Sequence, residues 1–198
     1  LLTTAGSDRI LTMDLHAGQI QGFFDIPVDH LFSVGVFVDY FSKMNIKELV
    51  AVSPDVGSIK MARGYAKRVS AGLAIIDKRR VSPEKAEAMH IMGEVEGKNV
   101  IIIDDMIATG SSLIEAVEAL KKARAKTIYA AITHGILSGP AIERIDQCQG
   151  LEKLLISDSV PLPAEKRHEK IQVLSVANLL AEAIKRIHNE ESVSCLFD

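Results

Sequence analysis

The sequence predicts an α/β fold in which a central parallel sheet is flanked by helices on both faces. Short β-branched runs alternate with amphipathic stretches, which is the pattern of strands joined by helical crossovers. The run from Val100 to Ile103 is apolar without alternation, as expected of a strand buried on both faces. A composition of 47% hydrophobic and 25% charged residues is ordinary for a globular domain.

Six runs bounded by Gly, Pro, Asp or Ser are predicted to be strands. They cover residues 9–15, 48–53, 73–77, 99–104, 127–133 and 153–157. Two stretches between or after them place apolar side chains on one helical face. These side chains are Ile59, Ala62, Ala66 and Val69 in the first stretch, and Val176, Leu180, Ala183 and Ile187 in the second.

Composition narrows the expected partners to small molecules and other protein chains. A net charge of −3 and a pI near 6.1 give no electrostatic footprint for nucleic acid, and no apolar run could span a membrane. Cys148 and Cys195 are too few for a disulfide framework and lack metal-ligand spacing. We therefore expect a cytoplasmic location, where thiols stay reduced.

The segment of residues 100–112 carries the clearest chemical pattern. Its apolar strand ends in Asp104 and Asp105, and a Thr-Gly-Ser-Ser turn then opens a helix. Ligands of open α/β sheets bind beyond the carboxyl ends of the strands. The N–H groups and hydroxyls of such a turn suit a phosphate, because the positive end of the helix dipole lies behind them. Carboxylates repel phosphate, so we expect them to accept hydrogen bonds from the vicinal hydroxyls of a ribose.

The turn also has a purely structural interpretation. Ser112 and Glu115 have the spacing of a capping box, which closes a helix N-terminus without any ligand. For the turn alone both interpretations stand, and the acidic pair favours the phosphosugar. The segment is not a Walker P-loop, because no Gly-Lys-Ser/Thr sequence follows.

Two other strand ends supply candidate metal ligands. Asp14 and His16 lie two residues apart, so an extended strand points both to one side, where they could meet a hydrated divalent cation. A histidine near a strand end is more often structural. Asp55 can hold a metal ion or cap the following helix, and the pattern alone favours the cap.

The basic run Lys78, Arg79 and Arg80 follows a buried strand and opens a predicted mobile flap over residues 78–87. A charge run is normally a solvated surface. Basic side chains on a mobile segment also neutralise a transferring phosphoryl group when the segment closes.

Six parts of the chain match the sequence motifs of one enzyme family. They are residues 12–30, 52–55, 78–80, 104–106, 133–135 with 138–140, and 192–197. On these motifs the chain resembles the ribose-phosphate diphosphokinases, also called phosphoribosyl pyrophosphate synthetases, over essentially its whole length. The acidic strand and Thr-Gly turn alone would fit any phosphoribosyltransferase.

The resemblance implies a transferase that moves diphosphate from ATP to the 1-hydroxyl of ribose 5-phosphate, with Mg²⁺ as cofactor. It implies substrate-binding roles for Asp104 and Asp105 at the ribose hydroxyls, and for Ala108, Thr109, Gly110, Ser111 and Ser112 at the 5-phosphate. It implies metal-binding roles for His16 and Asp55, with Asp14, Asp25 and Asp29 as further candidates. Lys78 and Arg80 would be catalytic because they stabilise the negative charge on the transferring diphosphate. Arg80 would also bind substrate.

The resemblance further implies regulation by phosphate and nucleotides at a site between subunits. The matching residues are Gln21, Asp29, Ser192 and Ser194. Such a site implies a homo-oligomer, and the family resemblance suggests dimer units arranged in a hexamer.

Family members have two similar phosphoribosyltransferase-like domains, and the resemblance divides this chain accordingly. Residues 1–31 would end a truncated N-terminal domain, residues 32–172 would form the domain that binds ribose 5-phosphate, and residues 173–198 would pack on the N-terminal domain. The adenine-binding segments would then be absent. We therefore expect the parent protein to be active and these 198 residues alone to be inactive.

Ala108 departs from the family pattern, which usually has an acidic residue there. The backbone amides remain, so weaker sugar binding is expected.

Two alternatives stay open: a non-catalytic regulatory relative of the synthetase, and a purine or pyrimidine phosphoribosyltransferase. The flap cations and Thr-Gly turn argue against the first. Residues 13–16 and the C-terminal motif argue against the second.

Overall fold

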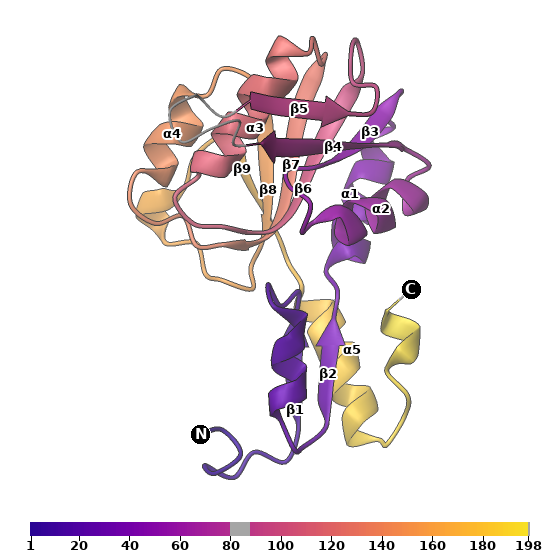
Figure 1. Cartoon of the computed structure of the whole chain (residues 1–198). Helices are drawn as coiled ribbons and strands as arrows, with labels where there is room; N and C mark the ends of the chain where they lie inside the picture. The colour runs from indigo at the N-terminus through magenta and orange to yellow at the C-terminus, as the bar shows by residue number, and fades with distance from the viewer. Residues whose placement is uncertain (80–87, 198) are drawn as a thin grey trace.

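The computed structural model describes residues 1–79 and 88–197, which form a larger and a smaller lobe (Figure 1). The larger lobe is built on a seven-stranded sheet of order β5-β4-β3-β6-β7-β8-β9. Its strands are β3 (Leu49–Ser53), β4 (Gly72–Arg79), β5 (Ala88–Met92), β6 (Asn99–Ile107), β7 (Thr127–Gly135), β8 (Leu151–Ser157) and β9 (Ile171–Leu174). Neighbouring strands are parallel except β4 and β5. The prediction of a mostly parallel α/β sheet is confirmed.

Helices cover both faces of this sheet. On one face α1 (Val34–Met44) and α2 (Ile59–Arg68) pack on the alternate β6 residues Ile101 and Ile103. On the other face α3 (Ser111–Lys122) and α4 (Ala141–Gln147) share a core with Ile102. The uninterrupted apolar run of β6 follows from this arrangement, because successive side chains enter opposite cores.

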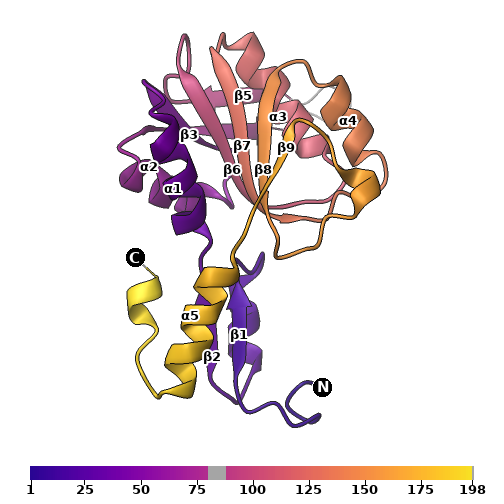
Figure 2. The ribbon, with the colours of Figure 1, turned by 180° about the vertical axis from the view of Figure 1, so that it is seen from behind.

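The smaller lobe contains the two ends of the chain (Figures 1 and 2). The strands β1 (Ile10–Met13) and β2 (Val28–Leu31) form a parallel pair, with the 3-10 helix η1 (Gly18–Phe23) between them in sequence. Helix α5 (Ala177–His188) lies beside this pair, and the 3-10 helix η3 (Ser194–Leu196) follows it. The chain enters the larger lobe after β2 and leaves it after β9. The 3-10 helix η2 (Ala164–Lys166) lies between β8 and β9. The predicted domain boundaries remain predictions.

Several predicted elements have different limits in the structure. The sequence did not indicate β2, β5 or β9, which are short, and β5 and β9 lie at the edges of the larger sheet. Strand β6 continues to Ile107, so Asp104 and Asp105 lie within it and not beyond its end. Lys78 and Arg79 belong to β4, so the expected flap does not begin there. The rest of that segment, including Arg80, lies outside the described residues. Within the described ranges, no helix is long and apolar enough to cross a membrane.

Candidate functional site

A groove of about 300 Å³ runs along the carboxyl ends of β3 and β6. Most of the substrate, metal and cation candidates from the sequence line it. These are His16, Asp55, Lys78, Asp104, Asp105, Ala108, Thr109, Gly110, Ser111 and Ser112. The tertiary structure therefore brings together residues that lie as far apart in the sequence as His16 and Ser112.

The turn between β6 and α3 is arranged as an anion cradle. The carbonyl oxygens of residues 107–110 all accept protein hydrogen bonds. Their donors are the N–H groups of Ile136 (3.1 Å), Leu137 (3.2 Å), Ser138 (2.9 Å) and Ile114 (3.0 Å) and the guanidinium of Arg144 (2.8 Å). By contrast, within residues 1–79 and 88–197 no protein acceptor is found for the N–H groups of residues 109–112. Free N–H groups at a helix N-terminus bind anions, so the turn is set to receive one.

The capping-box interpretation of this turn is wrong. Helix α3 begins at Ser111, its N-cap is Gly110, and no side chain caps it. Glu115, the expected partner of Ser112, forms an ion pair with Lys78 at 2.9 Å. Gly110 has a φ of 79°, a left-handed conformation that glycine adopts without strain. The helix N-terminus is thus left open to a ligand.

Asp104 is a half-buried carboxylate with two other carboxylates, Asp105 and Asp55, nearby. Burial raises its pKa to about 6, and the neighbouring Asp105 and Asp55 carboxylates add to the rise. The Ser58 hydroxyl, 2.9 Å from Asp104 Oδ1, and the Asp105 N–H at 3.0 Å act in the opposite direction. Both bonds reach Oδ1, which leaves Oδ2 available to hydroxyl donors from the groove.

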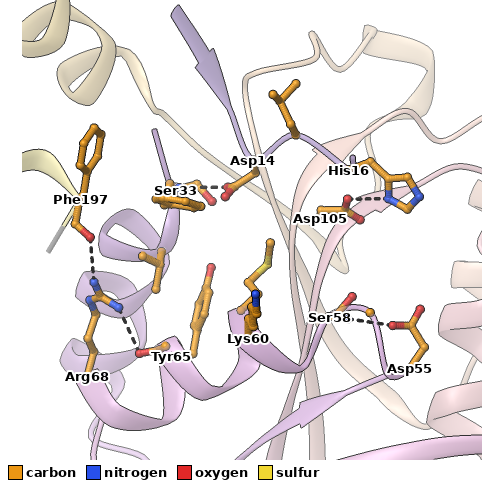
Figure 3. Close-up of a pocket in the computed structure, with 16 residues that line it drawn as sticks. Asp14, His16, Ser33, Asp55, Ser58, Lys60, Tyr65, Arg68, Asp105 and Phe197 are labelled. Atoms are coloured by element: carbon orange, nitrogen blue, oxygen red, sulfur yellow. Dashed lines mark hydrogen bonds and ion pairs between the residues drawn. The ribbon is translucent and has the colours of Figure 1, made fainter. Parts of the chain in front are cut away.

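Asp105 points to the other face of β6 and pairs with His16. The distance from His16 Nδ1 to Asp105 Oδ2 is 2.7 Å, so Nδ1 carries the hydrogen, because a carboxylate can only accept (Figure 3). This hydrogen bond is the main reason that the pKa of His16 is raised. The His16 side chain remains 76% exposed, and its Nε2 is free to meet a ligand when the ring is neutral.

The prediction that Asp55 caps the following helix is wrong, because the N-cap of α2 is Ser58 and no side chain caps the helix, but Asp55 still lines the groove. Its Oδ1 accepts the N–H of Ser58, at 2.9 Å, just before α2 (Figure 3). The described residues contain no group of three or more His, Cys, Asp or Glu that could hold a metal ion. One or two carboxylates with water suit Mg²⁺, which keeps much of its hydration and completes its shell with substrate phosphates. Asp55 fits that donor set, and His16 lines the same groove.

The other three metal candidates do not join this set. Asp14 is 3% exposed, and its Oδ2 accepts the Ser33 N–H at 3.0 Å and the Thr133 hydroxyl at 2.8 Å. Asp29 lies in β2 and pairs with Arg9 at 2.6 Å. Asp25 follows η1 in the smaller lobe. Among the residues described, the groove is lined by neither Asp25 nor Asp29.

The proposed regulatory residues lie on two parts of the smaller lobe. Gln21, in η1, is 3.2 Å from His30 Nδ1, and Asp29 lies in the neighbouring strand. Ser192 and Ser194 are hydrogen-bonded to each other at 2.7 Å in the C-terminal segment. That segment lies across β2 and α5 from β1 (Figure 1).

Sequence analysis missed three contributors to the site. Ser58 and Thr133 bond the acidic side chains, and Arg144 bonds the turn. Thr133 lies in a segment that matched the family, but no local pattern gave it a role.

A second cavity of about 430 Å³ adjoins the groove through His16, Asp55 and Asp105 and extends to Phe197 (Figure 3).

The sequence and the structure of the chain are both similar to those of known proteins. The family model described as the phosphoribosyl synthetase-associated domain matches residues 78–198. Ribose-phosphate pyrophosphokinases of Clostridium acetobutylicum and Bacillus caldolyticus are 51% and 52% identical to the chain, covering all of it and 62% of each relative. The crystal structure of phosphoribosylpyrophosphate synthetase from Mycobacterium smegmatis matches 96% of this chain and 61% of its own, with 38% identity and a TM-score of 0.88. The chain thus spans about three fifths of the length of these relatives.

Proposed function

The chain belongs to the family of phosphoribosyl synthetase-associated domains, and we propose that it carries the ribose 5-phosphate half of a ribose-phosphate diphosphokinase. In this reaction the 1-hydroxyl oxygen of ribose 5-phosphate forms a bond to the β-phosphorus of ATP. The bond from that phosphorus to the α–β bridging oxygen breaks, which gives phosphoribosyl pyrophosphate and AMP.

The observation that carries the proposal is one groove that holds both an anion cradle and a pair of carboxylates. The free N–H groups of residues 109–112 would receive the 5-phosphate. Asp104 and Asp105 would accept hydrogen bonds from the ribose hydroxyls. Ala108 supplies no side-chain acceptor, so the sugar would be held mainly by these two carboxylates.

Positive charge would hold the transferring diphosphate in the groove. Lys78, whose side chain is 27% exposed, would exchange its pairing with Glu115 for the transferring diphosphate. Asp55 and His16 would hold Mg²⁺, which would neutralise phosphate charge when bound. Arg80 would act beside Lys78. Preorganised positive charge at this position stabilises the charge that develops on the transferring group.

The same proposal extends to partners. ATP and ribose 5-phosphate would be the substrates, phosphate and nucleotides the regulators, and the protein a homo-oligomer built from dimer units, such as a hexamer. Gln21, Asp29, Ser192 and Ser194 would take part in a regulatory site between subunits. Gln21 and Asp29 belong to η1 and β2, and Ser192 and Ser194 belong to the C-terminal segment, which lies on the far side of β2 from β1 (Figure 1).

The test is AMP formation by the full-length protein from ATP and ribose 5-phosphate, with and without Lys78→Ala. Loss of one charge contact to the transferring group should lower kcat by about a hundredfold, since such contacts contribute about 2.7–4 kcal/mol to catalysis. Lys98→Ala is the matched control, because Lys98 also pairs with a glutamate, Glu94 at 3.2 Å, and does not line the groove.

Three outcomes separate the alternatives. Wild-type activity in Lys78→Ala would remove Lys78 from the mechanism. Binding of ribose 5-phosphate with no AMP formed by the wild-type protein would favour the regulatory relative. Release of diphosphate from phosphoribosyl pyrophosphate in the presence of a purine or pyrimidine base would favour a phosphoribosyltransferase.

A further inference from the structure

Arg144 of α4 contacts the anion cradle from behind. Its Nη1 lies 2.8 Å from the carbonyl oxygen of Thr109 and 2.8 Å from the hydroxyl oxygen of Ser111. This nitrogen has two hydrogens, so it can donate one to each acceptor. Arg144 does not line the groove; it lies in a separate depression with residues of α3 and α4. It therefore acts on the turn and not on a ligand in the groove.

The bond to Thr109 sets the direction of a peptide unit. In a trans peptide the carbonyl oxygen and the following N–H point in opposite directions. Because Arg144 draws the Thr109 carbonyl toward α4, the Gly110 N–H is directed away from Arg144. The hydrogen bond from the Ser138 N–H to the Ala108 carbonyl, at 2.9 Å, orients the preceding peptide in the same way.

The bond to Ser111 leaves its proton available. A serine hydroxyl has one hydrogen and two lone pairs, and a guanidinium can only donate. Arg144 therefore occupies a lone pair of Ser111 and cannot use its hydrogen. That hydrogen can be donated to the Thr109 hydroxyl, 3.2 Å away, or to an anion in the cradle.

Packing holds α4 against the same turn. A Cβ atom on Gly110 would lie 3.7 Å from the Cα of Ala141, the first residue of α4. Ala141 is itself fully buried, so this end of the helix cannot shift freely. Arg144 lies one turn further along α4, so the turn and α4 meet through the close approach of Gly110 and Ala141 and through two charge-assisted hydrogen bonds.

We propose that Arg144 is a positioning residue for the 5-phosphate of ribose 5-phosphate, acting through the Thr109 carbonyl and the Ser111 hydroxyl. The inference rests on the proposed function for the identity of the anion. Arg144 also brings a positive charge behind a turn that has no basic residue of its own, residues 108–112. Its removal should weaken binding of the phosphate and leave the binding of ATP unchanged.

The experiment compares Arg144→Met, Arg144→Lys and the wild type in the full-length protein, with ribose 5-phosphate varied at saturating ATP. Methionine keeps the aliphatic length and removes both hydrogen bonds. Because both charge-assisted hydrogen bonds are lost, the KM for ribose 5-phosphate should rise by about tenfold or more. We expect kcat to change by less than about threefold and the KM for ATP to stay constant. Arg144→Lys should recover part of the loss. The control is Arg124→Met, because Arg124 pairs with Glu96 outside the groove.

Calorimetric titration with ribose 5-phosphate separates this inference from the proposed activity. If the wild type forms no AMP but binds ribose 5-phosphate, and Arg144→Met weakens that binding, the activity is wrong and the positioning role stands. An unchanged affinity in Arg144→Met would overturn the role. So would a parallel rise in the KM for ATP with no recovery in Arg144→Lys, because that result indicates general damage. If Arg144→Met does not fold, Arg144→Gln gives the same comparison.

Discussion

The two lobes of the molecule differ in how completely they bury their own apolar residues. In the larger lobe Phe37, Ile102 and Ile103 are at most 1% exposed, because helices cover both faces of the sheet. In the smaller lobe η1 has no buried residue and α5 has only Ala183, while Phe23 is 86% exposed and Ile184 59%. The larger lobe carries its own core, whereas the smaller lobe leaves large apolar side chains exposed.

The contact between the lobes is polar and lies beside the groove. Asp14, at the end of β1, accepts hydrogen bonds from Ser33 and Thr133 of the larger lobe. His134 Nε2 lies 3.1 Å from the carbonyl oxygens of both Met13 and Asp14, so this nitrogen carries the ring hydrogen. These contacts place His16, two residues after Asp14, beside Asp105.

The largest expected difference between the lobes concerns two phenylalanines. Phe37→Ala should lower the free energy of unfolding by about 3–5 kcal/mol, because it leaves a cavity in a closed core. Phe23→Ala should change it by no more than about 0.5 kcal/mol, because that side chain is already in water. Urea unfolding of both variants provides the measurement. Equal losses would show that the smaller lobe has a core of its own under these conditions.

A smaller effect is expected at the contact between the lobes. Thr133→Val keeps the side-chain shape but removes the hydroxyl that bonds Asp14 and Ser33, so stability should fall by about 1–3 kcal/mol. Hydrogen exchange should accelerate in β1 and remain slow in β6. The control is Thr127→Val, at the start of β7 and far along the strand from this contact. Faster exchange throughout both lobes would contradict a local role.

The smallest expected effect on stability concerns the cradle itself. Gly110→Ala places a Cβ on a residue with a φ of 79°, which should cost about 1–2 kcal/mol. The strain falls at the turn that would hold the 5-phosphate, so the affinity for ribose 5-phosphate should fall as well. Gly22→Ala in the smaller lobe is the control, because nothing lies within 4 Å of the position of its Cβ. Unchanged affinity in Gly110→Ala would separate the turn from phosphate binding.

Much of the larger lobe could be predicted from local patterns. The strand at Val100 to Ile103 and the helix after Gly110 each depend on consecutive residues, and both are present. The edge strand β5 was missed because its pairing with β4 comes after a charged segment that suggested a loop. The prediction that Lys78 lies in a flap was wrong for the same reason, because the basic run includes the last residues of β4.

The sequence by itself determined the α/β class and the chemistry of the turn, because the acidic pair and the Thr-Gly-Ser-Ser segment are contiguous. Only the tertiary structure decided which polar groups stay available there. Glu115 is drawn from its helix end by Lys78, 37 residues away, and the carbonyls of the turn are oriented by residues 137–144. One carboxylate oxygen of Asp14 accepts a hydrogen bond from Thr133, 119 residues away. Hydrogen bonds of that range depend on how parallel strands align at one edge of the sheet, which no local pattern of residues specifies.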